Sequence, residues 1–140
     1  MGIWKKLFGG ATGHAVNYYR EGVELARVGN FHEALTSFRL ALRDSPSDTE
    51  VLQEIAMVYT RIGMTDDAMK TYRTVLAQNG DAAGAHYGLA FLLLHEGKKD
   101  EATNHLRRFL ASPPQGPEAG KHIEHAKKTL DELTSLPKGE

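Results

Sequence analysis

The chain of 140 residues contains no cysteine. Without thiols it has no disulfide bond, no thiol nucleophile and no thiolate metal site. A reducing compartment is compatible with that composition. Long apolar runs are missing too, because no stretch reaches the about 18 continuous apolar residues that a membrane-spanning helix requires. We therefore expect a cytoplasmic protein.

The sequence also lacks an excess of charge of one sign. Lysine and arginine together number 17 and aspartate and glutamate 18, which gives a net charge of −1. Such a chain has no global field that would draw it to nucleic acid, and we predict no nucleic-acid partner. No serine, histidine and carboxylate arrangement and no Gly-Lys-Ser/Thr phosphate motif is evident. We therefore predict that the protein is not an enzyme, has no catalytic residues and needs no cofactor.

What the sequence does contain is a period of 34 residues. Four independent series of identical residues share this spacing, and a period of 34 built from paired helices is typical of a helix–turn–helix solenoid. Such arrays present surfaces that hold partners. The four series are Gly29, Gly63 and Gly97; Ala34, Ala68 and Ala102; Arg39, Arg73 and Arg107; and Leu42, Leu76 and Leu110.

The period divides the chain into three units, at residues 15–48, 49–82 and 83–116. Each unit is predicted to contain a first helix, a turn with glycine and a second helix, which in the first unit are residues 16–28 and 31–43. Glycine suits the end of the first helix because it accepts a positive φ without a steric penalty. Helix caps are expected at Asn30, Ser47, Thr65 and Asp81.

Residues 117–140 follow a proline-rich stretch that ends the third unit. They are predicted to form one more helix, at residues 118–133, and a tail. Its apolar face would cover the open end of the array as a cap. His122 and His125 lie three residues apart on this helix, without a His-Glu-x-x-His pattern or a convergent acidic group. We expect both to be solvated and predict no metal site.

Small and bulky residues recur at the same positions of each unit. They are Tyr18, Gly22, Leu25, Ala34, Phe38, Ala41 and Pro46 in the first unit, Leu52, Ile55, Ala56, Tyr59, Ala68 and Tyr72 in the second, and Leu89, Ala90, Ala102 and Pro114 in the third. With these residues the chain resembles the tetratricopeptide repeat family, over residues 15–116 and without an insertion. The resemblance implies an all-α, right-handed superhelix of three helix–turn–helix repeats plus a C-terminal capping helix.

In this family the first helices of successive repeats line a concave groove. The resemblance assigns the partner-binding groove to Tyr19, Arg20, Val23, Arg27, Gln53, Met57, Arg61, Tyr87, Phe91, Leu94 and His95. Aromatic residues, methionine and arginine are enriched at protein interfaces. An apolar peptide or amphipathic helix of another protein is therefore the expected partner. Gly84 and Gly88 either leave a notch for that partner or allow close packing of helices.

Some family members hold the acidic tails of heat-shock chaperones in a clamp of lysine, asparagine and arginine. The corresponding residues here match none of these types, and a glutamate among them would repel a carboxylate. They are Tyr19, Val23, Glu54, Gly84 and Gly88. We therefore exclude chaperone-tail binding of that kind.

Residues 1–14 lie outside the period and contain a short amphipathic stretch. Its apolar side chains fall on one helical face, with two lysines beside them. The stretch comprises Ile3, Trp4, Lys5, Lys6, Leu7 and Phe8. This pattern suits weak contact with a membrane surface, docking on a protein groove of its own or a neighbouring chain, or a frayed segment without a role.

The sequence thus favours a small cytoplasmic adaptor that holds another protein in its groove. One alternative is a peripheral adaptor at the inner face of a membrane, attached through residues 1–8. Another is a homo-oligomeric scaffold, in which these residues of one chain fill the groove of the next. Groove residues define the chemical class of a ligand but do not name the molecule.

Overall fold

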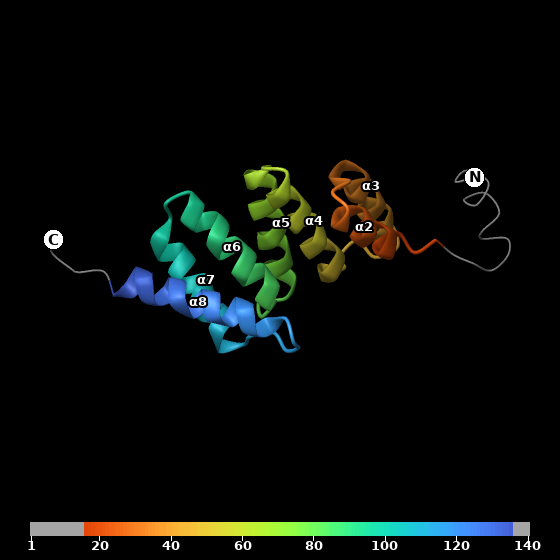
Figure 1. Ribbon diagram of the computed structural model, residues 1–140. Coiled ribbons are helices and arrows are strands. Elements are labelled where there is room, and N and C mark those ends of the chain that lie inside the picture. The colour runs from red at the N-terminus through yellow and green to blue at the C-terminus, as the bar shows by residue number, and fades with distance from the viewer. Residues whose placement is uncertain (1–15, 136–140) are drawn as a thin grey trace.

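The computed structural model describes residues 16–135, which form seven α-helices and no β-strand (Figure 1). Six of the helices pair into three hairpins, and the seventh follows the last hairpin. The all-α superhelix with a capping helix that the sequence predicts is confirmed for this part of the chain. The helices are α2 (Tyr18–Arg27), α3 (Phe31–Leu42), α4 (Thr49–Arg61), α5 (Thr65–Gln78), α6 (Ala83–His95), α7 (Lys99–Ala111) and α8 (Ala119–Thr134).

The three hairpins turn in the same way. Gly29, Gly63 and Gly97 have φ angles of 89°, 82° and 79°, a region that glycine enters without steric cost. The amide after each glycine donates to a carbonyl near the end of the first helix, which satisfies an otherwise unpaired acceptor. These bonds are Asn30 N to Leu25 O at 2.8 Å, Met64 N to Tyr59 O at 2.9 Å and Lys98 N to Leu93 O at 2.9 Å.

This turn, rather than a side-chain cap, determines where each second helix begins. The residues before α3, α5 and α7 have nearly identical backbone angles, with φ from −85° to −89° and ψ from 69° to 71°, and none forms a side-chain cap bond. Asn30 occupies the N-cap position of α3 as predicted, but its side chain forms no cap bond. The cap predicted at Thr65 is wrong, because Met64 occupies that position. The cap before α4 is Asp48, not Ser47, and its carboxylate accepts from the amides of Glu50 and Val51. The residue before α6 is Ala82, which has no such bond, so the cap predicted at Asp81 is also wrong.

Small residues bring the paired helices together. Ala34, Ala68 and Ala102 are fully buried. At Gly22 in α2, a Cβ atom would lie 2.5 Å from the Phe38 ring of α3, so the close approach requires glycine. The core therefore repeats along the array, with consecutive helices packed side by side.

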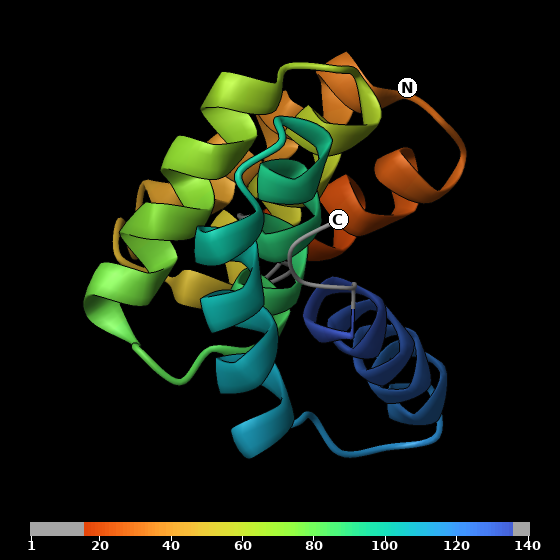
Figure 2. The same cartoon turned by 90° about the vertical axis from the view of Figure 1, so that its left-hand side faces the viewer.

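Helix α8 packs against α7 and caps the last hairpin (Figure 2). Ala126 is fully buried and contacts a cluster formed by Ala90, Leu106 and Phe109. Ile123, Leu130 and Leu133 pack around the same cluster, as the predicted apolar face requires. No helix within residues 16–135 is long and apolar enough to cross a membrane. Whether the chain divides at residues 15, 49, 83 and 117 stays a prediction.

Candidate partner-binding groove

Two clefts lie along the first helices of the three hairpins. One, of about 360 Å³, lies between α2 and α4, and the other, of about 610 Å³, lies between α4, α6 and α8. Met57, Thr60 and Tyr72 line both clefts, so the two form one continuous surface that we call the groove. Its walls are mainly apolar.

Six residues that the resemblance assigns to partner binding line this groove. The cleft at α2 and α4 contains Val23, Arg27 and Arg61, and the cleft at α6 contains Tyr87 and Phe91. Met57 lies in both, and its side chain is 51% exposed. A large apolar side chain with that exposure is available for contact with another molecule.

Tyr19 and Gln53 contact other parts of the protein itself. The Tyr19 ring lies 6.2 Å from that of Phe38, and its hydroxyl donates to Glu50 at 3.4 Å. The amide oxygen of Gln53 would lie 2.5 Å from a Cβ atom at Gly84. Both side chains therefore support the walls of the groove.

Leu94, Arg20 and His95 lie outside the groove. Leu94 is partly buried against the core between α5, α6 and α7, because α6 packs on helices at several sides. Arg20 lines a separate cleft along α2, together with Val16 and Val28. His95 is exposed at the end of α6. That any of the residues assigned by resemblance binds a partner stays a prediction.

The notch predicted at the two glycines of α6 is filled from within. The Tyr72 side chain of α5 occupies the space in which a side chain at Gly88 would lie, and Gln53 does the same at Gly84. Burial raises the pKa of Tyr72 to about 12, so its hydroxyl remains neutral. Both glycines also line the larger cleft, so close packing of helices and a surface open to a partner occur together at this part of α6.

Two histidines of α8 form part of the groove wall. The His125 ring stacks on Phe91 with centroids 4.5 Å apart and planes 7° apart, and its Nδ1 lies 2.7 Å from the Tyr87 hydroxyl. The His122 ring meets the Tyr87 ring edge-on at 4.9 Å. Both histidines are exposed, as expected, and in addition their rings contact aromatic side chains of α6. Their spacing on the capping helix is visible in the sequence, but the contact with α6 depends on how α8 packs.

Opposite charges lie at the two edges of the groove. Glu50 and Glu54 belong to the first half of α4, whereas Arg61 is its last residue. Burial, and secondly the charge of Glu50, raise the pKa of Glu54. At the other edge Arg27 pairs with Glu24, and the Arg61 guanidinium lies 5.3 Å from the Phe31 ring centroid. The groove therefore has an acidic and a basic edge.

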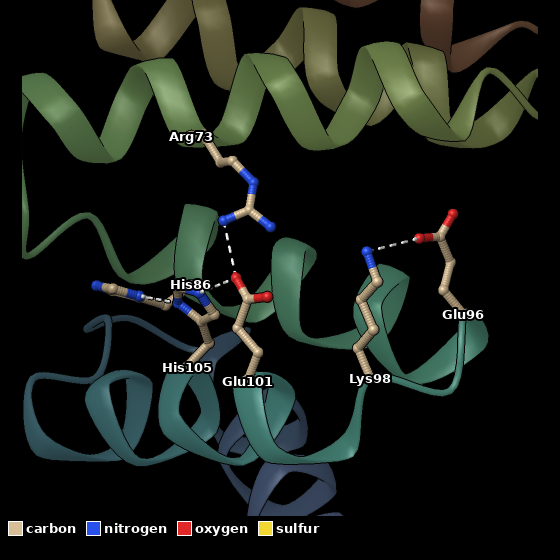
Figure 3. Close-up of polar contacts among 6 residues, drawn as sticks. All are labelled: Arg73, His86, Glu96, Lys98, Glu101 and His105. Carbon is tan, nitrogen blue, oxygen red and sulfur yellow. Dashed lines mark hydrogen bonds and ion pairs between the residues drawn. The ribbon is translucent and has the colours of Figure 1, made fainter.

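A second polar cluster lies where α5, α6 and α7 meet, away from the groove (Figure 3). His86 is 4% exposed, and its Nδ1 lies 2.9 Å from Nδ1 of His105. Arg73, one of the repeated arginines, donates to Glu101 at 2.8 Å and lowers the pKa of that carboxyl. Within residues 16–135 no group of three or more histidine or acidic side chains is arranged to hold a metal ion.

The amphipathic stretch at residues 3–8 lies outside the described residues. Its predicted contact with a membrane, a partner or a groove therefore stays a prediction.

Comparison with known proteins places the repeats in a family. A family model described as tetratricopeptide repeat matches residues 25–83 and 63–122. The photosystem I assembly protein Ycf3 of Parasynechococcus marenigrum is 32% identical over 95 residues, which cover 61% of this chain and 55% of that protein. The mouse DnaJ homolog subfamily C member 3 is 29% identical over 115 residues, covering 82% of this chain and 23% of that protein. The chain thus spans about half or less of the length of these relatives.

Solved structures show the same fold. The tetratricopeptide repeat domain of P58(IPK) aligns with a TM-score of 0.76 and 24% identity, covering 84% of this chain and 32% of that one. The Yersinia enterocolitica type III secretion chaperone SycD, in complex with a peptide of the translocator YopD, aligns with a TM-score of 0.77 and 16% identity, covering 84% and 90%. The residues that match the family model run from the end of α2 to the first turn of α8, and the chain belongs to the tetratricopeptide repeat family.

Proposed function

We propose that this protein is a non-enzymatic adaptor that holds an apolar or amphipathic segment of another protein in its groove. The observation that carries the proposal is the continuous apolar surface from Val23 through Met57 to Phe91. It is long enough for a peptide because it crosses three successive hairpins. Exposed methionine and aromatic side chains can adapt to an apolar segment and bury it.

The comparisons support peptide binding by a protein of this fold. The similar SycD structure contains a translocator peptide, and another, the first such domain of Spaghetti (RPAP3), contains an HSP90 peptide. The relatives named photosystem I assembly proteins suggest a role in assembling larger complexes. In that role the groove would cover an apolar segment of a partner until the partner is incorporated into its complex.

Affinity capture with groove variants tests the proposal. Met57→Asp places a charge in both clefts and should cost about 2 kcal/mol or more of binding free energy, roughly 30-fold in affinity. Met64→Asp is the matched control, because Met64 is a similarly exposed methionine at the turn before α5, outside the groove. Proteins captured from the source cells by the intact chain and by M64D should be lost with M57D, while circular dichroism of all three remains helical. The same proteins captured equally by M57D would contradict the proposal.

A further inference from the structure

The start of α2 lies at the acidic edge of the groove. Tyr19, in the first turn of α2, donates to Glu50 in the first turn of α4, so both helices begin at this edge. Burial, and secondly the nearby carboxylates of Glu54 and Glu50, raise the pKa of Tyr19 to about 12. Arg61 ends α4, seven residues beyond Glu54 and about 10 Å farther along its axis.

Glu54 is an acidic group in an otherwise apolar part of the groove. It shares the cleft with Val23, Ala26 and Met57. Among residues 16–135 it forms no hydrogen bond and no ion pair with another side chain, and its charged neighbour Glu50 repels it. A partly buried carboxylate in this position is stabilised by a positively charged group that enters the groove.

We propose that residues 3–8 of the same chain occupy the groove when no partner is bound, with Lys5 and Lys6 at the acidic edge and Trp4 on the apolar floor beside Met57. The inference rests on the groove of the proposed function but concerns its unliganded state. The composition of residues 3–8 matches the acidic edge of the site. Apolar side chains and two lysines meet a mainly apolar cleft that contains Glu54, with Glu50 one turn earlier on α4, whereas Arg27 and Arg61 lie at the opposite edge.

The covalent connection favours docking within one chain. Only residues 9–15 separate the segment from Val16, and eight peptide units reach at most about 27 Å. Their attachment point lies just before α2, whose first turn already contacts the acidic edge. A tether of this length gives an effective concentration in the millimolar range, so that even a weak interaction is populated. A partner protein must then displace residues 3–8 from the groove, and this competition lowers the apparent affinity of the partner.

Trp4 reports on this docking because it is the only tryptophan in the chain. In the intact folded protein we expect blue-shifted emission and acrylamide quenching that is several-fold weaker than in urea. Glu54→Lys and Met57→Asp should shift the emission to the red and restore quenching. Glu33→Lys, an exposed change on α3, and Met64→Asp are the matched controls and should leave Trp4 protected. Circular dichroism verifies that each variant is folded.

Three outcomes would overturn the inference. The first is that Trp4 in the intact folded chain is quenched as strongly as in urea. The second is that the protection of Trp4 disappears on dilution, which indicates docking on a second copy of the chain. The third is that Trp4 is protected only after vesicles containing phosphatidylglycerol are added, which indicates a membrane surface.

The variant K5E/K6E separates this inference from the proposed function. It should expose Trp4 and increase partner capture by the groove. Protected Trp4 together with no groove-dependent capture would refute the proposed function alone. Exposed Trp4 in the intact chain together with capture that M57D abolishes would refute this inference alone.

Discussion

The histidine pair between α6 and α7 should make the stability of the fold depend on pH between about 5 and 7. His86 Nε2 lies 2.7 Å from the Gly80 carbonyl and must donate to it, because a carbonyl only accepts. With the proton on Nε2, Nδ1 of His86 accepts a hydrogen bond, and His105 Nδ1 donates to it over 2.9 Å. Nε2 of His105 is left without a proton and lies 3.7 Å from Glu101 (Figure 3).

A proton added to this pair binds His105 Nε2, where it faces the Glu101 carboxylate. The resulting imidazolium is partly buried and lies against the His86 ring, with centroids 5.2 Å apart. Burial and then the neighbouring His86 lower the pKa of His105. The folded state therefore binds fewer protons than the unfolded chain, in which histidines titrate near pH 6.5.

The sign and size of the effect follow from this difference. A lowered histidine pKa contributes stability above about pH 6.5 that is lost as the pH falls. If one proton is excluded, the free energy of unfolding falls by at most about 1.4 kcal/mol per pH unit. Glu101 reduces this value because its charge favours the protonated form of His105, and the His105 side chain is still 17% exposed.

Urea unfolding at pH 7.5, 6.5 and 5.5, followed by circular dichroism, measures the effect. His105→Gln retains a donor for His86 without a group that ionises, so its stability should fall less between pH 6.5 and 5.5. His122→Gln, on the exposed part of α8, is the control and should behave as the intact protein does. An equal pH dependence in H105Q and the intact protein would refute the reasoning.

Two stability predictions follow from the packing and capping of the helices. Gly88→Ala should lower the free energy of unfolding by about 1–3 kcal/mol, because the added Cβ atom would collide with the buried Tyr72 ring. An unchanged melting temperature would contradict this prediction. Asp48→Ala should lower the free energy of unfolding by about 1 kcal/mol because it removes the cap of α4, whereas Ser47→Ala should leave it almost unchanged. Urea unfolding of both variants measures the difference, and an equal loss in the two would contradict the assignment of the cap to Asp48.

The helices and their turns were predictable from the sequence because they depend on local chemistry. A period of 34 with glycine at one position specifies the turn, and the turn itself starts the next helix. The same fact explains the errors in the predicted caps. Asn30 and Thr65 have good capping side chains, but the backbone after Gly29 and Gly63 already begins a helix without them.

The groove was predictable only in part. Repeat positions indicate which face of a helix a residue occupies, and this places Met57 and Phe91 on the concave side. They do not indicate which neighbouring side chain covers that residue. Leu94 packs into the core because α6 has neighbours on several sides, and Gly88 is filled because Tyr72 is large. Such contacts depend on side chains that are distant in the sequence.

The capping helix contributes both to the core and to the wall of the groove. Ala126 buries the open end of the array, and one residue earlier His125 stacks on Phe91 in the groove. The family model ends at residue 122, so His125 lies beyond the part of the chain that this match covers. One wall of the larger cleft therefore comes from a helix that is not a repeat. Proteins with the same repeats but a different cap would have a different cleft at this end, because the cap supplies the aromatic and hydrogen-bonding groups that meet Tyr87 and Phe91.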